Sequence, residues 1–344
     1  MSERVLVIRP DGMGDVLLTG PAVRAIAASG AEVTFLAGPA GAAAAALLPG
    51  VSSVLTAEIP WIAADPDPFD PASVWSLADQ VRAVAPTAAV IFTSFHQSPL
   101  PTALVLRLTG VPRIAAISVD YPGALLDVRH RVDDDIPEAE RNLSLAAAAG
   151  FSLPPGDNGR LAVTEQRPDP SRWVHGRYVV VHAQASVPAR SPSVDWTAEM
   201  VAALARAGRQ VVVTGSDGDA EITAVICAQV PGAVDLGGRT SLRMLAAVLA
   251  GADVVVAPNT GAAHLAAAVG TPVVSLFAPV VPARRWAPYG VPYRLLGQQD
   301  AACAGTRARV CPVGGHPCLN SIDRAEVVAA VADLAARVPA EAGR

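Results

Sequence analysis

The order of apolar runs and alanine-rich stretches constrains the fold of this chain more than any other feature. In the first half, apolar runs such as RVLVI and AEVTFLAG alternate with helix-like stretches such as DVLLTGPAVRAIAAS. A second series of the same kind starts at YVVVHAQAS and continues to PVVSLFAP. Strands that alternate with helices form parallel sheets that are covered on both faces. The sequence therefore predicts an α/β fold with two doubly wound, Rossmann-like sheets.

The two series divide the chain into two predicted domains. A chain of 344 residues is long enough for two cores of ordinary size. A loop rich in Pro, Gly and Asp ends the first series, and VTEQRPDPSRW follows as a linker. We therefore predict an N-terminal domain over residues 1–160 and a C-terminal domain over residues 172–344, facing a central cleft. Ligands of such sheets bind beyond the carboxyl ends of the strands.

The composition excludes several kinds of chemistry. The chain contains no lysine, so all 26 basic residues are arginine. This excludes lysine Schiff bases and a P-loop, because a P-loop needs its lysine. A net charge of −5 gives no sign of a nucleic-acid partner. The first apolar run is too short for a signal peptide, and no apolar segment approaches the roughly 20 residues that span a bilayer. We expect a cytoplasmic protein.

The stretch RPDGMGDVLLTGPAV follows the first predicted strand and places carboxylates where a phosphate would ordinarily bind. Gly12 and Gly14 supply only two glycines of the G-x-G-x-x-G pattern, and Asp15 would repel a pyrophosphate. Asp15 is then either the N-cap of a helix that begins near Val16 or a functional carboxylate. In the second case the helix N-terminus favours its ionised form. Without a neighbouring cation, it can act as a general base toward a hydroxyl.

The segment after the predicted strand DVVVA is a better phosphate site. A proline ends the strand, and Asn259, Thr260 and Gly261 lead into a helix that Asn259 or Thr260 can cap. No acidic residue occurs over residues 258–279, so the amides at the helix start can bind an anion. His264, one turn into the helix, can add a hydrogen-bond donor. The alternative is a capped crossover helix with a buried histidine.

A second loop can reach the same diphosphate. It follows the strand YVVVHA and reads QASVPARSPSVDW. Ser186 and Arg190 lie in this loop, and Arg190 can supply positive charge in a chain that has no lysine. The alternative is an ordinary surface arginine in a loop.

Two sets of residues raise the question of a bound metal, and we expect neither to hold one. Acidic D-x-D strings occur at residues 65–67, 133–135 and 217–219. None of these strings closes a clear strand. The second set consists of Cys303, Cys311, Cys318 and His316. Its spacing lacks a C-x2-C knuckle, so we expect packed or loosely exposed thiols instead.

These motifs together resemble glycosyltransferase family 9, whose best-known members are the ADP-heptose:lipopolysaccharide heptosyltransferases. The matching stretches occur in family order and span nearly the whole chain: VLVIRPDGMGDVLLTGPAVRAI, SFHQSPLPTALVLRLTGVPRI, VVVHAQASVPAR, NTGAAHLAAAVGTPVVSLFAPVVPARRW and HPCLNSI. The resemblance implies the GT-B fold, with an N-terminal acceptor-binding domain and a C-terminal nucleotide-sugar-binding domain. It also implies inverting, metal-independent transfer from an ADP-heptose-like donor, which is a substrate, with no further cofactor.

The resemblance assigns roles to single residues. The family's catalytic aspartate falls on Asp15, and Gly14 and His96 fall on the acceptor side. The donor-phosphate loop falls on Thr260, Gly261 and His264. The chain departs from the family in two places. Asn259 stands where the family usually has aspartate, which removes a charge beside the donor, and an insertion follows Arg190. These departures leave the donor preference open.

Several alternatives stay open on the sequence. The acceptor hydroxyl can belong to a lipopolysaccharide core, another envelope glycan or glycolipid, or a small natural product. The chain can instead be a GT-B-fold nucleotide-sugar epimerase, which acts on its donor without an acceptor. It can also be an inactive homologue that binds a nucleotide-sugar, although the presence of Asp15 argues against this. We expect at most peripheral contact with the inner face of the membrane.

Overall fold

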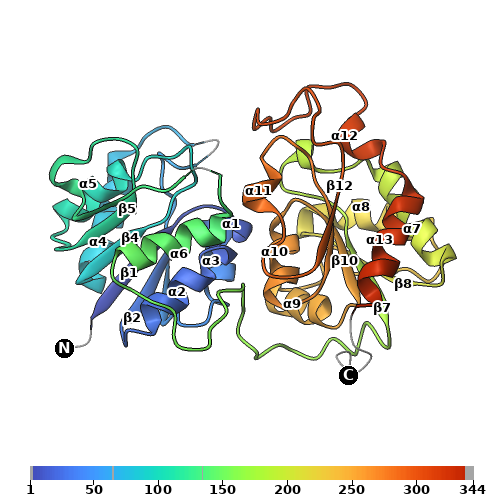
Figure 1. Cartoon of the computed structure of the whole chain (residues 1–344), viewed down its shortest axis with the longest axis horizontal. Helices are drawn as coiled ribbons and strands as arrows, with labels where there is room; N and C mark the ends of the chain where they lie inside the picture. The colour runs from blue at the N-terminus through green and yellow to red at the C-terminus, as the bar shows by residue number, and fades with distance from the viewer. Residues whose placement is uncertain (1–2, 64–65, 134, 338–344) are drawn as a thin grey trace. The chain divides into compact units, whose positions relative to one another are not determined.

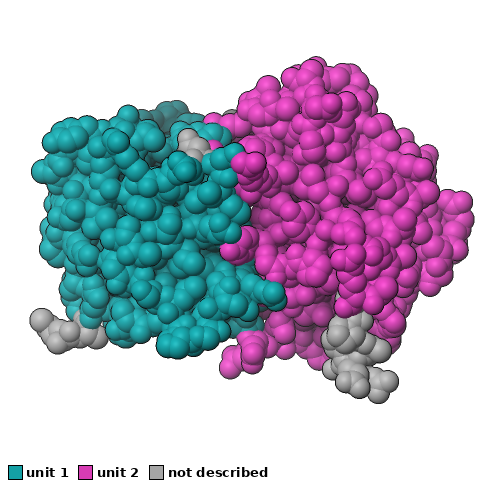
Figure 2. All heavy atoms as spheres, in the orientation of Figure 1, with its two compact units in different colours: residues 1–164 teal, residues 165–344 magenta. Residues whose placement is uncertain are grey.

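The computed structural model describes residues 3–63, 66–133 and 135–337. The chain forms two compact units, residues 1–164 and 165–344, which Figure 2 colours teal and magenta. Within the described residues, each unit holds a six-stranded parallel sheet and its own apolar core (Figure 1). The predicted α/β fold with two Rossmann-like sheets is therefore confirmed.

The sheet of the first unit has the strand order β3-β2-β1-β4-β5-β6. Its strands are β1 Arg4–Arg9, β2 Glu32–Ala37, β3 Ser53–Thr56, β4 Ala88–Ile91, β5 Ile114–Ile117 and β6 Val128–His130. The central strand β1 is buried from its second residue to its last. Burial on both faces explains why this strand reads as an uninterrupted apolar run in the sequence.

The helices of the first unit pack in pairs: α2 against α6, α1 against α3, and α4 against α5. Their bounds are α1 Met13–Leu17, α2 Gly20–Ala27, α3 Pro39–Ala45, α4 Pro71–Val84, α5 Leu100–Leu108 and α6 Glu138–Ala148, with a short 3-10 helix η1 Gly123–Leu125. The stretch from Asp15 that was expected as one helix is divided into α1 and α2. Pro21 fits the first turn of a new helix, where its missing N–H removes no hydrogen bond.

The sheet of the second unit has the order β12-β11-β10-β7-β8-β9. Its strands are β7 Tyr178–His182, β8 Gln210–Thr214, β9 Val234–Asp235, β10 Val254–Pro258, β11 Val273–Leu276 and β12 Tyr293–Leu296. Its helices are α7 Val194–Arg206, α8 Ala220–Ala228, α9 Leu242–Ala250, α10 Gly261–Ala268, α11 Ala283–Trp286, α12 Pro317–Asn320 and α13 Arg324–Ala335, with 3-10 helices η2 Pro188–Arg190 and η3 Asp217–Asp219.

The strands that sequence reasoning missed are those at the sheet edges. β3, β6, β9 and β12 contain exposed or half-buried residues at most positions. A short strand that is partly open to water carries no continuous apolar run, so its residues do not stand out from a loop.

Both sheets reverse their strand order at a defined point. In the first unit the point lies between β1 and β4, and in the second it lies between β7 and β10. Ligands of doubly wound sheets bind beyond the carboxyl ends of the strands at such a point. The loops that follow these four strands are therefore where each unit is expected to carry its site.

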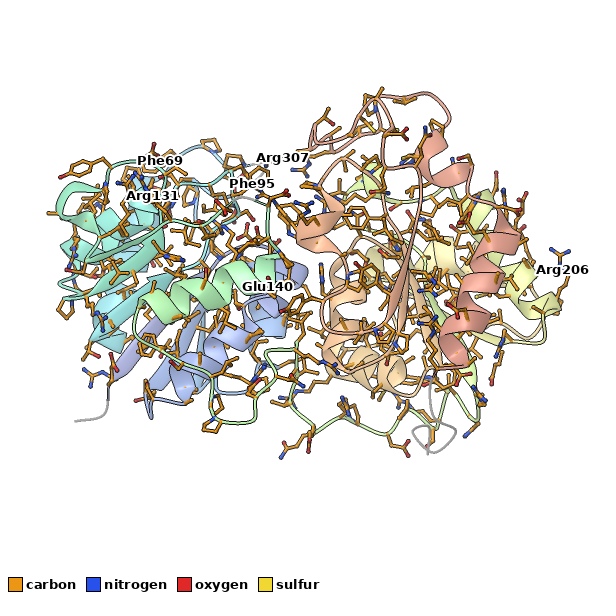
Figure 3. The ribbon with its side chains drawn as sticks, viewed as in Figure 1. Phe69, Phe95, Arg131, Glu140, Arg206 and Arg307 are labelled. Atoms are coloured by element: carbon orange, nitrogen blue, oxygen red, sulfur yellow. The ribbon has the colours of Figure 1, made fainter. Side chains whose placement is uncertain are left out.

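Charged side chains mostly lie on the surface, as Arg131 and Arg206 do (Figure 3). Among the described Arg, Asp and Glu residues, those buried are Arg9, Glu138, Arg141 and Arg285. Three of the four lie together at the switch point of the first sheet. Within the described ranges, no helix is long and apolar enough to span a membrane.

Candidate active site

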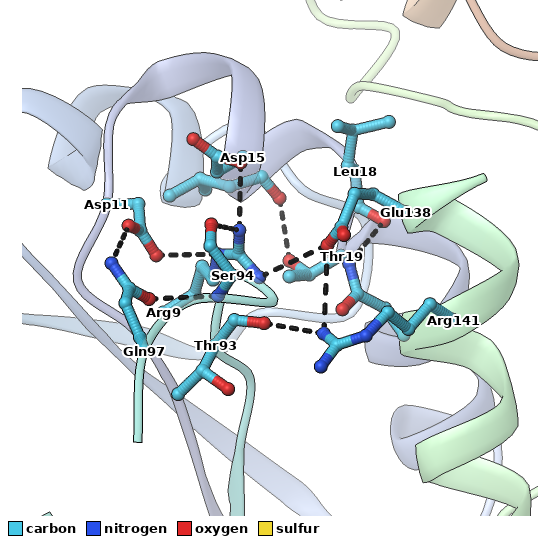
Figure 4. A network of polar contacts seen from close by, with 12 residues as sticks. Arg9, Asp11, Asp15, Leu18, Thr19, Thr93, Ser94, Gln97, Glu138 and Arg141 are labelled. Atoms are coloured by element: carbon cyan, nitrogen blue, oxygen red, sulfur yellow. Dashed lines mark hydrogen bonds and ion pairs between the residues drawn. The ribbon is translucent and has the colours of Figure 1, made fainter. Parts of the chain in front are cut away.

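A network of charged and polar side chains lies at the carboxyl ends of β1 and β4 (Figure 4). Arg9, the last residue of β1, is at its centre and is 0% exposed. Its Nε lies 2.8 Å from Asp11 Oδ2, and its Nη2 donates to Asp15 Oδ1 at 2.8 Å. Its Nη1 lies 3.8 Å from Glu138 Oε2. One buried guanidinium is thus shared by three carboxylates.

Asp15 differs from its expected position in the helix. Helix α1 begins at Met13, and Gly12, in an extended conformation, is its N-cap. The first intrahelical bond runs from Val16 N–H to Gly12 O at 3.1 Å. The prediction that Asp15 caps a helix beginning near Val16 is therefore wrong, and Asp15 is the third residue of the helix. It still lies in the first turn, where the helix dipole favours an anion.

The condition that a general base has no neighbouring cation is not met at Asp15, because Arg9 binds it directly. The arginine ends a central strand beneath α1, where it is shielded from water. A buried guanidinium must be paired, and the carboxylates of the segments that follow β1 pair with it. The side chain of Asp15 nevertheless keeps 28% of its surface exposed. In Figure 4 its second oxygen points away from Arg9.

Asp11 belongs to a closed ring of hydrogen bonds and ion pairs that includes Arg9, Ser94 and Gln97. Gln97 Nε2 donates to Asp11 Oδ1 at 2.7 Å, and Ser94 N–H donates to Gln97 Oε1 at 2.9 Å. Arg9 Nη2 donates to Ser94 Oγ at 2.8 Å, which completes the ring. The loop after β4 is thereby tied to the loop after β1.

Helix α6 closes the buried side of the network. Glu138, its first residue, is 0% exposed and lies 3.8 Å from guanidinium nitrogens of both Arg9 and Arg141. Arg141 Nη1 also donates to Thr93 O at 2.6 Å. Removing one member of a buried ion pair typically costs about 3–5 kcal/mol of stability. The ion pairs of Glu138 therefore hold Arg9 and Arg141 in place.

Burial and charge act in opposite directions within this network. Burial by itself lowers the pKa of Arg9, but the charges of Asp11, Asp15 and Glu138 outweigh it and raise that pKa above its usual value. Burial raises the pKa of Asp11 and the charge of Asp15 adds to this, while Arg9 and Gln97 act in the opposite direction. Arg9 therefore stays charged, and the charge of Asp15 adds to the proton affinity of Asp11.

The two residues expected on the acceptor side lie at the same strand ends. Gly14 immediately precedes Asp15 in α1. His96 is exposed in the loop after β4, one residue before Gln97, and its ring packs edge-on against Phe95 with centroids 5.3 Å apart. Sequence order and strand pairing thus bring both residues to the carboxyl ends of β1 and β4.

In the second unit, the predicted donor residues lie in the two loops at the switch point. Ser186 is exposed in the loop after β7, and Arg190 ends the short helix η2 in the same loop. The loop is held by Ala185 N–H, which donates to Ser191 Oγ at 2.8 Å. Asn259, Thr260, Gly261 and His264 follow β10.

The start of α10 has the features expected of an anion site. Thr260 is its N-cap, but no side chain caps the helix, and its first turn contains no acidic residue. His264 is 5% exposed. The amides of the first turn therefore have no capping side chain to satisfy them, and the helix dipole favours negative charge there.

Among the described residues, buried polar atoms without a partner lie at this helix start and on or just after the two strands that neighbour β10. Asn259 is 5% exposed, and neither its Oδ1 nor its Nδ2 has a hydrogen-bond partner within the described part of the chain. The same holds for Nε2 of Gln184, just after β7, and for Oγ of Ser275 on β11. An unsatisfied buried polar group costs about 1–3 kcal/mol, which a bound polar ligand would recover. Sequence reasoning missed Gln184 and Ser275.

No metal centre is evident in the described ranges, where no three His, Cys, Asp or Glu residues are arranged to hold an ion. Cys303 and Cys318 are each 2% exposed in the core of the second unit. His316 Nε2 lies 3.1 Å from Ala189 O. Asp219 of the third acidic string accepts hydrogen bonds from Ser216, the N-cap of η3, and so completes a capping box. Asp65 and Asp134, of the other two strings, lie outside the described residues.

Two doubly wound parallel sheets in succession form the GT-B architecture, and this is the fold class of the chain. Residues 76–316 match the profile of Glycosyltransferase family 9 (heptosyltransferase). The match covers well over half of the chain, so the chain belongs to this family and is a glycosyltransferase.

Individual relatives agree with this assignment. The chain is 34% identical over 104 residues to the lipopolysaccharide core heptosyltransferase OpsX of Haemophilus influenzae, a match that spans 28% of this chain and 29% of that protein. The structure of E. coli ADP-heptose lipopolysaccharide heptosyltransferase II superposes with a TM-score of 0.75 at 22% identity, covering 97% of this chain and 99% of that one.

A second solved structure, E. coli heptosyltransferase WaaC with ADP-2-deoxy-2-fluoro heptose, gives a TM-score of 0.69 at 21% identity over 86% of this chain and 94% of that one. A family 9 glycosyl transferase from Veillonella parvula gives a TM-score of 0.78 at 15% identity over 98% of both chains. At these identities the structures show a shared fold.

Proposed function

We propose that this glycosyltransferase moves a heptose-like sugar from an ADP-sugar to a hydroxyl of a glycan or glycolipid acceptor, with inversion at the anomeric carbon. Asp15 is the general base. The observation that carries this proposal is the contact between Arg9 and Asp15 Oδ1 at 2.8 Å, which holds a partly exposed carboxylate at the switch point of the first sheet.

Inversion needs one displacement and one base. The acceptor hydroxyl oxygen attacks the anomeric carbon of the donor and forms the new glycosidic bond. The bond between that carbon and the diphosphate oxygen breaks, and the diphosphate leaves with the electron pair. The hydroxyl proton passes to the carboxylate of Asp15, whose position Arg9 and the first turn of α1 define.

The leaving diphosphate needs positive potential, which the second unit can supply without a metal. The amides at the start of α10 provide it, because the first turn carries no acid. We assign the phosphates to Thr260, Gly261 and His264, with Ser186 and Arg190 contributing from the loop after β7. Fixed donors of this kind stabilise developing charge without reorganisation.

The choice of donor and acceptor rests on the relatives. WaaC has been solved with an ADP-heptose analogue, and OpsX is a lipopolysaccharide core heptosyltransferase. We extend this donor class to the present chain, and we propose that any membrane contact is peripheral. We propose that Asn259 influences which nucleotide-sugar the site prefers. Its side-chain amide offers both a hydrogen-bond donor and a hydrogen-bond acceptor and carries no charge.

The decisive experiment is the Asp15→Asn variant, assayed for transfer from ADP-heptose to a lipopolysaccharide core. We expect transfer to fall by about 10²–10⁴-fold, while ADP binding measured by calorimetry changes little. Asp79→Asn is the matched control, because the Asp79 side chain is 75% exposed and lies in α4. Wild-type turnover by Asp15→Asn would remove this residue from the mechanism.

The same assay distinguishes the reactions that need no acceptor. Consumption of ADP-heptose at an undiminished rate without acceptor would indicate an epimerase or a hydrolase. ADP binding with no turnover on any glycan would indicate an inactive nucleotide-sugar-binding homologue. Transfer to another glycan or a small molecule, but not to the lipopolysaccharide core, would preserve the mechanism and change the acceptor.

A further inference from the structure

The contact between Arg9 and Asp15 poses a chemical difficulty. A cation beside a carboxylate stabilises the ionised form and so makes the carboxylate a weaker base. A general base works best when its pKa is not far below the operating pH. A buried arginine paired with Asp15 alone would therefore position the residue at the expense of its reactivity.

We infer that Asp11 and Glu138 neutralise the charge of Arg9, so that the guanidinium positions Asp15 without withdrawing its capacity to take a proton. The inference rests on the proposed role of Asp15 as base. In this arrangement Arg9, Asp11 and Glu138 are positioning residues, and Asp15 is the only one of these four residues that touches the acceptor.

The division of contacts on the guanidinium supports this assignment. Nε faces Asp11 at 2.8 Å and Nη1 faces Glu138 at 3.8 Å, which leaves Nη2 for Asp15 and Ser94. Each carboxylate therefore has its own nitrogen, and none displaces another. The Glu138 side chain is 0% exposed and that of Asp11 is 12% exposed, against 28% for Asp15. The two compensating carboxylates lie inside, and the reactive one faces outward.

The charge count agrees with this division. Asp11, Asp15 and Glu138 carry three negative charges when ionised, and Arg9 and Arg141 carry two positive ones. The negative charges of Asp11 and Glu138 thus oppose the effect of the Arg9 charge on Asp15. The charged and polar groups linked to Asp15 through this network are Arg9 of β1, Asp11 of the following loop, Ser94 and Gln97 after β4, and Glu138 and Arg141 of α6.

The ring through Gln97 explains how Asp11 keeps its place. Gln97 Nε2 holds Asp11 Oδ1 at 2.7 Å, so that Oδ2 faces Arg9. Loss of the carboxylate charge at residue 11 would leave Arg9 held by Ser94, Asp15 and Glu138. The guanidinium charge would then act on Asp15 with less opposition. The expected consequence is that Asp15 takes up its proton only at a lower pH.

The test follows the carboxyl groups directly by NMR in protein labelled with 13C at the aspartate carboxyl carbon. The Asp15 signal is identified by its loss in Asp15→Asn. In Asp11→Asn and in Glu138→Gln, we expect its titration midpoint to move to lower pH, by about one unit for Asp11→Asn. Asp79→Asn is the matched control, because it removes an exposed carboxylate of α4 outside the network, and the Asp15 midpoint should move much less in it.

The possible outcomes separate this inference from the proposed function. An unmoved Asp15 midpoint in folded Asp11→Asn and Glu138→Gln would overturn the inference, and so would an equal shift in Asp79→Asn. Failure of both charge variants to fold, as judged by circular dichroism, would make the carboxylates structural and also overturn it. Because the measurement needs no substrate, activity in Asp15→Asn would reject the general base without touching the electrostatic result.

Discussion

His182 and Thr214 are register partners at the carboxyl ends of β7 and β8, and His182 Nδ1 lies 3.0 Å from Thr214 Oγ1. Burial lowers the pKa of His182 to about 4, although the charge of Asp219 opposes this shift. The imidazole is therefore neutral at pH 7. It lies next to the loop that carries Ser186 and Arg190, and because burial keeps it neutral it adds no positive charge to the end of β7.

The lowered pKa of His182 predicts that the folded protein loses stability in acid. The unfolded chain binds a proton at His182 below about pH 6.5, whereas the folded chain binds it only near pH 4. The contribution of His182 to the free energy of unfolding is therefore fully present above pH 6.5. The free energy of unfolding falls by about 1–3 kcal/mol as the pH drops toward 4. His182→Asn should remove this part of the decline in urea denaturation curves. His175→Asn, at an exposed position, should leave it unchanged.

Gly261→Val tests the phosphate site at the start of α10. The branched side chain would occupy space where phosphates approach the backbone, so ADP affinity should fall about 10–100-fold, the equivalent of one or two charge-assisted hydrogen bonds. Calorimetry measures the loss. Gly314→Val is the control, because nothing lies within 4 Å of a Cβ there. Unaltered ADP binding by Gly261→Val would place the phosphate site elsewhere.

Recognition of charge at the same helix predicts a difference between two ligands. ADP should compete with the nucleotide-sugar, and adenosine should compete at least about tenfold less well, because it lacks the diphosphate. His264→Ala should weaken ADP binding in the same direction as Gly261→Val but less severely. Equal affinities for ADP and adenosine would contradict a site built around the diphosphate.

Transfer should not require a divalent metal ion. The start of α10 carries no acidic residue that would hold a metal beside the diphosphate, and the helix amides with Arg190 can stabilise the leaving group. Activity measured after exhaustive treatment with EDTA should equal that of the untreated enzyme. Loss of activity that magnesium or manganese restores would show that a metal carries the leaving-group charge.

Arg24 and Asp157 predict a stability effect away from the site. Arg24 donates from Nε and Nη2 to the two Asp157 oxygens at 2.6 and 2.9 Å, and this interaction lowers the pKa of Asp157. Asp157→Asn should cost about 1–3 kcal/mol at pH 7. Because the folded pKa is lowered, the wild-type advantage is present above about pH 4 and is lost as the pH falls further. The exposed pair of Asp79 and Arg82 should contribute little.

The sequence was sufficient to place helix α10, for which we propose the donor phosphates, because its signal is local. A proline-terminated strand, a glycine and a helix without acids lie within a few residues of one another, from β10 into α10. The sequence leaves the N-cap open between Asn259 and Thr260, because both residue types can cap a helix. The structure makes Thr260 the N-cap without a side-chain hydrogen bond and leaves the Asn259 amide unpaired among the described residues.

The charged network could not be predicted in the same way. Arg9 meets Asp11 and Asp15 close by in the sequence, but it meets Ser94 across 85 positions. A signal was present, since an arginine directly ends an apolar strand, yet nothing local showed which way its side chain turns. The direction depends on α1 and α6 covering the strand, and therefore on the order of the strands.

The sequence by itself determined the two parallel sheets, their central strands and the helices between them. Strands that are buried on both faces require continuous apolar runs, and helices require apolar residues at the helical period of about 3.6 residues. It also determined the family, through motifs that follow one another in order. Only the tertiary structure decided that Asp15 is held by a buried arginine with two further carboxylates behind it. The reason is physical: an ion pair between distant segments depends on which strands become neighbours, and no local periodicity records that choice.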